Sequence, residues 1–393
     1  MNFRVFPILL TFFLMGLADA MGPLSDGVKD NYELSNVTST LLTFGVFIAF
    51  AVFSVPGGLL AARIGKKKLL LLGLGINAAA LVLPSIFAPP FPVLLGCIFM
   101  LGVGTTFLQV AGNPIMRDVS NEGRYSRNLA LAQGFKGVGS TASTYIVTAI
   151  GSLVIFKSLG WRAAFPLFCV LMTLAFVSVL FVKVKETKAD VPPSVASSLS
   201  LLKEPIFLLA VLGIFLYVGA EASMGRFLSP ALQNFGLEKE KASTYGPTLF
   251  FLMLTVGRLL GGAILNIMSA RTCFRLSALL GVIGSAVIIV GAGKAVAIAG
   301  IVAAGLGFAN IWPMLFSITV EERPERANEL SGLMCMAISG GAIMPLVMGK
   351  LADILGTSEA NAELNPIAFV VPVICFGYLF LLSLKGSRKP ATT

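Results

Sequence analysis

Twelve apolar runs, each about 20 to 29 residues long, follow one another along this chain with short polar stretches between them. A run of about 20 apolar residues is long enough to cross the hydrocarbon core of a bilayer as a helix. Because lipid offers the backbone no hydrogen-bond partners, such a segment must pair its amides internally, as an α-helix does. We therefore expect an all-α membrane protein with 12 transmembrane helices. The runs cover residues 5–24, 38–62, 69–88, 91–116, 127–155, 163–183, 205–230, 243–267, 273–292, 295–319, 327–350 and 365–385.

Charged residues make up only 12% of the 393 residues, and hydrophobic residues make up 56%. Soluble domains carry about 25% charged residues, so water cannot be the solvent for most of this surface. The net charge of +10 does not indicate nucleic acid, because the basic residues lie in short loops, where they orient membrane helices. Nineteen loop Lys and Arg residues fall on the side of the N-terminus and seven on the other side. We expect a multi-pass protein of the bacterial inner membrane with both termini in the cytoplasm.

The first run also resembles a secretory signal peptide. Arg4 precedes the apolar stretch, and Ala18-Asp19-Ala20 near its end has the small-residue pattern of a cleavage site. We interpret this run as the first span, because cleavage would leave eleven spans and break the internal repeat of the chain.

Residues 184–204 form the longest polar stretch, in which charged residues, Pro and Ser cluster at the middle of the chain. We expect a cytoplasmic linker here between an N-terminal six-helix bundle, residues 1–183, and a C-terminal six-helix bundle, residues 205–393. Short motifs of the first half recur 203 or 204 residues later: Gly102-Val-Gly104 as Gly305-Leu-Gly307, Gly57-Gly58 as Gly261-Gly262, and Met21-Gly22 as Met224-Gly225. Parallel repeats of six spans are typical of major facilitator transporters, whose substrate site lies between the halves near the midplane. The sequence therefore predicts two pseudo-symmetric halves with the major facilitator fold.

The loop after the second run has the sequence Gly58-Leu-Leu-Ala-Ala62-Arg63-Ile-Gly65-Lys66-Lys67. It resembles the major facilitator loop motif G-x-x-x-D-R-x-G-R/K-K, with Ala62 at the aspartate position. The glycines would allow close helix packing, and Arg63 would act in gating or would only anchor the loop at the membrane surface. In the second half, Arg258 lies within the eighth run, where its charge needs a partner or a carbonyl group. We predict a gating role for Arg63 and Arg258.

Five further segments resemble the fucose/glucose/galactose–proton symporter family, and together they extend over most of the chain. They are Leu108–Pro114 (LQVAGNP), Asn128–Phe135 (NLALAQGF), Tyr217–Glu221 (YVGAE), Phe308–Ser317 (FANIWPMLFS) and Ser331–Pro345. The resemblance implies sugar transport coupled to protons. Fucose-type members carry an acid at the position of Gln109 and another where Pro23 stands here. Gln109 cannot exchange a proton, so the coupling pair of that family is not carried over.

Proton chemistry in this chain must depend on carboxylates, because the sequence has no histidine. Asp19 in the first run and Glu221 in the seventh occupy similar depths, and an ionisable group inside the membrane indicates a functional site. We predict that both carry protons, although permanent pairing with Lys136 or Arg226 is the alternative. Lys136 either binds an anionic substrate such as a sugar acid or neutralises one of these acids, and we favour the second. The five cysteines lie inside apolar runs without a C-x-x-C pair, so we expect no disulfide, metal or cofactor.

Four amide side chains lie inside three of the runs, as Gln109, Asn113, Gln133 and Asn310. Amides donate and accept hydrogen bonds, as binding of sugar hydroxyls requires. Trp312 would supply an apolar face for a sugar ring. We predict a substrate site that also includes Lys136, while the plainer alternative is that the amides only tie helices together.

Together these features predict a secondary active transporter that takes up a monosaccharide or a related small polar solute with protons, by alternating access. Sodium coupling with a sugar or sugar acid, efflux of another compound, and a membrane sugar sensor that does not transport remain alternatives. No nucleophile–base pair or cofactor motif is visible in the sequence, so we do not expect an enzyme. We expect the protein to act as a monomer in the lipid bilayer, without a nucleic-acid partner.

Overall fold

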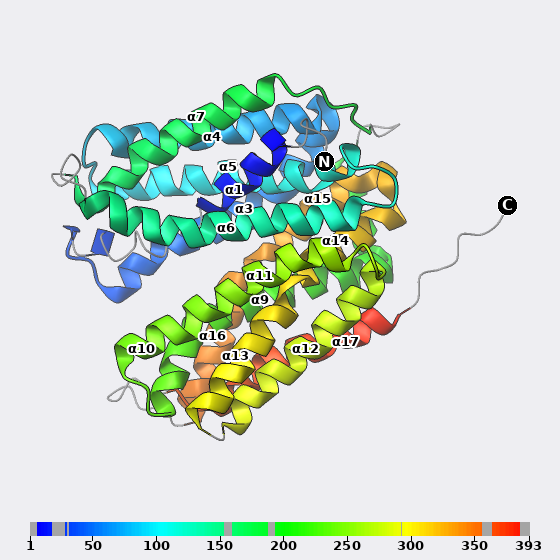
Figure 1. The fold of residues 1–393 in the computed structure, drawn as a ribbon. Coiled ribbons are helices and arrows are strands. Elements are labelled where there is room, and N and C mark those ends of the chain that lie inside the picture. The colour runs from blue at the N-terminus through cyan, green and yellow to red at the C-terminus, as the bar shows by residue number, and fades with distance from the viewer. Residues whose placement is uncertain are drawn as a thin grey trace. The chain divides into compact units, whose positions relative to one another are not determined.

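The computed structural model describes residues 6–17, 28–29, 31–152, 159–187, 193–291, 293–355 and 364–385. Over these ranges all regular secondary structure is helical, which confirms the predicted all-α class (Figure 1). By their contacts the helices divide into two compact units. The first contains Met1–Leu208 and Thr319–Ser339, and the second contains Leu209–Ile318 and Gly340–Thr393.

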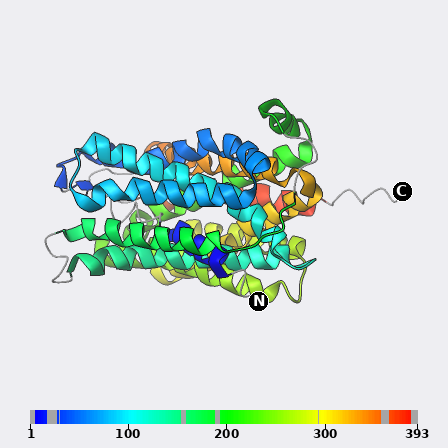
Figure 2. The same ribbon diagram turned by 90° about the horizontal axis from the view of Figure 1, so that it is seen from above.

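In the first unit, α1 packs on α6, α5 packs on both α3 and α4, and α4 packs on α7 (Figure 2). Glycines let α1 and α6 meet at the backbone. A Cβ at Gly16 would lie 2.0 Å from the carbonyl oxygen of Lys136, and one at Gly139 would lie 2.0 Å from that of Phe13. Such close approach is typical of membrane helices, whose association depends on van der Waals packing. The helices of this unit are α1 (Phe6–Leu17), α3 (Asn36–Ile64), α4 (Lys66–Ile86), α5 (Phe91–Asp118), α6 (Tyr125–Ser152), α7 (Ala164–Leu180), α8 (Val195–Ser200) and α15 (Ala327–Met336).

In the second unit, α12 packs on α13 and α17, and α11 packs on α13. An aromatic cluster fills its core, with the rings of Phe308 and Phe376 3.9 Å apart and those of Phe250 and Phe308 5.1 Å apart. The helices are α9 (Pro205–Asn234, whose first four residues belong to the first unit), α10 (Lys239–Ser243), α11 (Leu249–Ile264), α12 (Ala270–Val290), α13 (Lys294–Ala309), α14 (Ile311–Glu322, shared with the first unit), α16 (Gly340–Ile354) and α17 (Val370–Leu384).

Each of the twelve apolar runs coincides with at least one of these helices. In the described part of the chain, nine helices are long and apolar enough to cross a membrane, while α1 and α7 are shorter apolar helices. Two runs are divided. Asn310 separates α13 from α14, and the 3-10 turn Ala337–Ser339 separates α15 from α16.

The predicted polar linker contains helical structure, the short helix α8 followed by the 3-10 turn Leu201–Lys203. The α8 helix packs against α3 and α15. Contacts also group Thr319–Ser339, which lie in the second half of the sequence, with the first unit. The proposed domain boundaries at 183 and 205 follow chain order and remain a prediction.

Candidate functional site

Three of the predicted amides form one buried cluster in the first unit. Gln109 and Asn113 lie one turn apart on α5, so they share a face of that helix. Gln133 on α6 donates from Nε2 to Asn113 Oδ1 at 3.0 Å, and Asn113 Nδ2 donates to the Gln109 carbonyl oxygen at 2.9 Å. The exposed fraction of each residue is 3% or less. The structure therefore brings together three residues that the sequence placed on two runs.

The α15 helix completes this cluster. Pro114 has no N–H, so the carbonyl group of Val110, one turn earlier, lacks its usual helical donor. Ser331 on α15 takes that place, with its hydroxyl 2.8 Å from the Val110 oxygen. Cys335, one turn further along α15, has its Sγ 4.0 Å from Asn113 Nδ2. Sequence reasoning gave Ser331 and Cys335 no role, although the unpaired carbonyl before a proline was a signal for such a partner.

Lys136 lies on α6 one turn after Gln133 and is half-buried. Because Gln133 belongs to the amide cluster, Lys136 lies one turn away from that cluster along α6. Asp19, its predicted partner, falls outside the described residues. Whether Lys136 neutralises an acid or binds a substrate anion therefore stays a prediction.

The second unit holds an ion pair inside its helices. Arg258 on α11 is 7% exposed and has its Nη2 3.5 Å from Glu221 Oε2 on α9. The same nitrogen donates to the Tyr217 hydroxyl at 3.0 Å, and Nε donates to the Ala309 carbonyl oxygen at 3.2 Å. Pro313 frees that carbonyl group from its usual helical donor. Arg258 thus has both the acid and the carbonyl group that a buried guanidinium needs, and Glu221 pairs with a residue that the sequence analysis did not name as its partner.

Asn310 and Trp312 lie at the break between α13 and α14. Asn310 Nδ2 donates to the Gly257 carbonyl oxygen at 3.0 Å, so this amide ties α11 to the break. The Trp312 ring lies 5.8 Å from that of Phe316 and is 3% exposed. Asn310 Oδ1 and Trp312 Nε1 are buried and have no hydrogen-bond partner among the described residues. An unpaired buried polar atom costs about 1–3 kcal/mol, so these two atoms are candidates for contact with a ligand.

The loop motif places Lys66, rather than Arg63, in the interior. Arg63 is exposed, whereas Lys66 is 2% exposed and has its Nζ 2.5 Å from Asp118 Oδ2 at the end of α5. The carboxylate of Glu186 accepts from the backbone amides of Lys66 and Lys67 at 2.6 and 3.0 Å. These amides begin α4, where free N–H groups favour an anion. Two acids from elsewhere in the chain, Asp118 and Glu186, thus contact this loop, which has Ala62 at the aspartate position of the motif.

The glycine of the motif brings α3 against α15. A Cβ at Gly58 would lie 2.5 Å from the Asn328 carbonyl oxygen, and one at Gly332 would lie 2.9 Å from the Ser54 oxygen. The predicted close packing is present, and its partner is α15.

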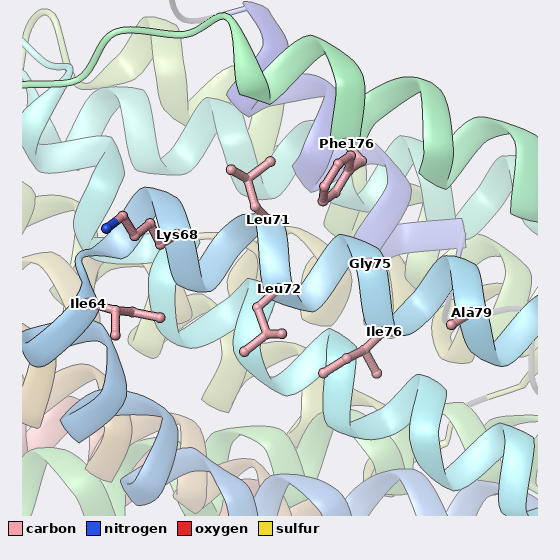
Figure 3. Close-up of a pocket in the computed structure, with 8 residues that line it drawn as sticks. All are labelled: Ile64, Lys68, Leu71, Leu72, Gly75, Ile76, Ala79 and Phe176. Carbon is pink, nitrogen blue, oxygen red and sulfur yellow. The ribbon is translucent and has the colours of Figure 1, made fainter.

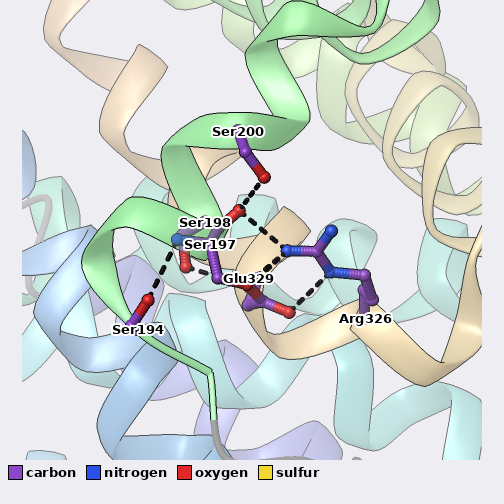
Figure 4. A network of polar contacts seen from close by, with 6 residues as sticks. All are labelled: Ser194, Ser197, Ser198, Ser200, Arg326 and Glu329. Carbon is purple, nitrogen blue, oxygen red and sulfur yellow. Dashed lines mark hydrogen bonds and ion pairs between the residues drawn. The ribbon is translucent and has the colours of Figure 1, made fainter.

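A polar network joins the linker helix α8 to the start of α15 (Figure 4). Glu329 is 5% exposed and accepts from Arg326 at 2.6 Å, from Ser197 at 3.0 Å and from Ser198 at 3.2 Å. Arg326 also donates to the Ser197 carbonyl oxygen at 2.8 Å. We call these four residues the linker clamp. From the sequence, Arg326 is only one of the nineteen basic loop residues on the side of the N-terminus.

Comparison with known proteins decides the family. The model of the Major Facilitator Superfamily matches residues 8–345. The chain belongs to the Major Facilitator Superfamily. This is a family of transporters, which confirms the expectation that the chain is not an enzyme and establishes a multi-pass membrane protein.

Relatives within the superfamily match over nearly the whole chain. A glucose/galactose transporter of Brucella abortus is 28% identical, over 99% of this chain and 95% of the relative. The L-fucose-proton symporter of Escherichia coli is 21% identical, over 95% of this chain and 90% of the relative. The crystal structure of the superfamily transporter FucP in the outward conformation has a TM-score of 0.83 at 19% identity, covering 97% of this chain and 98% of that one. The last likeness establishes the fold, which confirms the predicted major facilitator architecture.

Proposed function

We propose that this Major Facilitator protein takes up a monosaccharide or a related small polar solute together with protons, by alternating access. The buried amide cluster of Gln109, Asn113 and Gln133 is the observation that carries the proposal. Relatives named as sugar transporters, matched over almost their full lengths, support the same substrate class.

The amide cluster would bind the hydroxyl groups of the solute. Three amides offer several donors and acceptors within one small region, as a ring of hydroxyl groups requires. Their bonds to one another satisfy part of their hydrogen-bonding capacity. Trp312 and Asn310, each with an unpaired buried atom, are also proposed to contact the solute. Lys136 is proposed to neutralise an acidic side chain rather than to bind an anionic solute.

Glu221 and Arg258 would form the coupling element in the second unit. Protonation of Glu221 removes the negative half of the ion pair and leaves Arg258 with Tyr217 and the Ala309 carbonyl group. The carboxylate is partly exposed, with 23% of its side chain accessible, so a proton can reach it. Asp19 is the proposed counterpart in the first half. Moving one charge across 100 mV is worth about 2.3 kcal/mol, which corresponds to roughly 50-fold accumulation of the solute.

The contacts of α15 would form the gate on the side of the basic loops. The α15 helix lies in the second half of the sequence, yet it packs on α3 at Gly58 and Gly332 and on α8 through the linker clamp. If the sequence halves rock against each other, these contacts must separate to open that side. Arg63, exposed in the last turn of α3, has a proposed role in this step, and Arg258 is better assigned to the ion pair than to the gate.

The membrane setting is part of the proposal. The excess of Lys and Arg on one side favours a bacterial inner membrane with both termini in the cytoplasm. We propose that one chain transports by itself, since each half carries its own part of the site.

Uptake by purified protein in liposomes tests the function. We expect labelled glucose, galactose or fucose to accumulate when the outside is made acidic, and to equilibrate without accumulation when no gradient is applied. Accumulation driven by a sodium gradient alone would instead support the sodium-coupled alternative. Binding of a sugar without any uptake would support a sensor.

A further inference from the structure

A pocket lies on the first unit, on the surface that α4 and α7 present beside each other (Figure 3). Its lining is apolar apart from one lysine at its end. The residues are Ile64 at the end of α3, then Lys68, Leu71, Leu72, Gly75, Ile76 and Ala79 on α4, and Phe176 on α7. None of them belongs to the proposed substrate site.

The α4 residues of this pocket recur every three or four positions, so they form one continuous stripe along the helix. Leu72 is 41% exposed on a helix that is long and apolar enough to cross a membrane, so its side chain faces lipid. Gly75 keeps the middle of the stripe open, because a Cβ there would meet only Phe176, at 3.7 Å. The stripe therefore needs an apolar cover that the described residues of the chain do not supply.

The length of the stripe fits one lipid chain. Lys68 and Ala79 are separated by about 16 Å along the helix, at 1.5 Å per residue. The hydrocarbon core of a bilayer is about 30 Å thick, so one leaflet contributes about half of that. The stripe thus extends from the membrane surface to the region where the two leaflets meet.

The polar end of the pocket is strongly basic. Lys68 is exposed there, as are Arg63 and, on the segment after α7, Lys183 and Lys185. That segment lies against the start of α4, because Glu186 accepts from its backbone amides. Of the described acids nearby, Asp118 is paired with Lys66, and Glu186 is a single acid beside the four basic residues. The positive charge at the mouth of the pocket is therefore left for an external anion.

We propose that this pocket binds an anionic phospholipid, with one acyl chain along the α4 stripe and the phosphate at Lys68. The occupant is a lipid and not a free phosphate, because the pocket joins an acyl-sized apolar stripe to a cationic end. The proposal does not depend on the identity of the transported solute.

Retention of lipid by the purified protein tests this site. The protein is equilibrated with equal amounts of phosphatidylglycerol and phosphatidylcholine, and bound lipids are counted by native mass spectrometry. We expect preferential retention of phosphatidylglycerol, reduced about fivefold in Lys68→Gln, since one lysine near a membrane surface contributes about that factor for an anionic lipid. Gly75→Leu, which fills the stripe without a backbone clash, should reduce retention of the same lipid to a similar degree.

Two control variants keep the comparison specific. Lys294→Gln removes an exposed lysine at the start of another span, α13. Gly96→Leu adds the same bulk at a glycine on α5 whose Cβ would meet nothing within 4 Å. Both should retain phosphatidylglycerol as the unmodified protein does. Equal retention of the two lipids by the unmodified protein, or unchanged retention in both Lys68→Gln and Gly75→Leu, would overturn the proposal.

Discussion

Glu221 Oε2 on α9 lies 3.5 Å from Arg258 Nη2 on α11. The two residues are 37 positions apart in the sequence, and their contact fixes two helices of the second unit at one depth. A charge left alone in such a place is costly, so each side chain compensates the other. The ionised and the protonated pair therefore differ in how firmly α9 is held to α11.

The stability of this pair can be measured by a double-mutant cycle. Glu221→Gln leaves the Arg258 charge without its anion and should destabilise the protein by about 1–3 kcal/mol, less than a fully buried pair because Glu221 is partly exposed. Arg258→Met should also destabilise it, whereas the double variant should regain part of the loss. Thermal unfolding in detergent provides the measurement. Simple additivity of the two single effects would contradict a functional ion pair.

Asp19→Asn and Glu221→Gln should separate accumulation from exchange. Neither variant can release a proton from its changed side chain, so at least one should lose accumulation of sugar driven by a pH gradient. Exchange of internal for external sugar needs binding and rocking but no net proton movement, and it should persist. Liposome assays of both reactions decide the matter. If both variants accumulate sugar as the unmodified protein does, neither acid is the proton carrier.

Gln133→Ala should weaken sugar binding at least about tenfold. The substitution removes a donor to Asn113 and one amide from the cluster, and each lost hydrogen bond of a buried polar site costs about 1–3 kcal/mol. Gln233→Ala is the matched control, because Gln233 lies on α9, outside the cluster, and donates to a carbonyl group of its own helix, that of Ser229. Isothermal titration with the transported sugar gives both affinities. Equal affinities would remove the amide cluster from the substrate site.

Loss of the linker clamp should expose residues that α15 now keeps buried. Glu329→Gln weakens charge-assisted bonds to Arg326 and replaces an acceptor of Ser197 and Ser198 by a neutral one. Cys335 on α15 is fully buried in the structure, so its reaction with a maleimide reports opening. Both proteins compared carry Cys335 as their single cysteine, with the other four replaced. We expect faster labelling in Glu329→Gln than in the protein that keeps Glu329. Glu240→Gln, on the short helix α10 outside the clamp, should leave the rate unchanged.

Lys66 and Arg63 should differ in what they contribute. Lys66→Met leaves Asp118 buried without its cation, which should cost about 3–5 kcal/mol and lower the yield of folded protein. Arg63→Ala should change stability little, since its side chain is exposed, but should alter the transport rate if the residue acts in gating. Unfolding temperature and uptake rate, measured on both variants, separate the two roles. A large loss of stability in Arg63→Ala would contradict this assignment.

Run length and hydropathy were enough to predict the helical class, because the bilayer fixes how long an apolar helix must be. Helical spacing places Gln109 and Asn113 one turn apart wherever α5 lies, but their contact with Gln133 on α6 depends on helix packing. Partners distant in sequence could not be predicted in the same way. Lys66 with Asp118 and Arg258 with Glu221 depend on how helices pack, which hydropathy does not encode. The helix inside the polar linker was missed because six residues give no clear period.

In corresponding spans of the two halves, a proline leaves one backbone carbonyl group without its helical donor, and a side chain of another helix donates to it instead. The Val110 carbonyl group before Pro114 is paired by Ser331, and the Ala309 carbonyl group before Pro313 is paired by Arg258. A helix without proline makes all of its backbone hydrogen bonds itself, whereas each of these two spans takes one of them from a neighbouring helix. When α15 or the Arg258 side chain moves, the span that it supports can bend at that carbonyl group. The curvature of each span is thus thermodynamically linked to the position of its neighbour, so a local proton or solute event can be transmitted along the length of a helix.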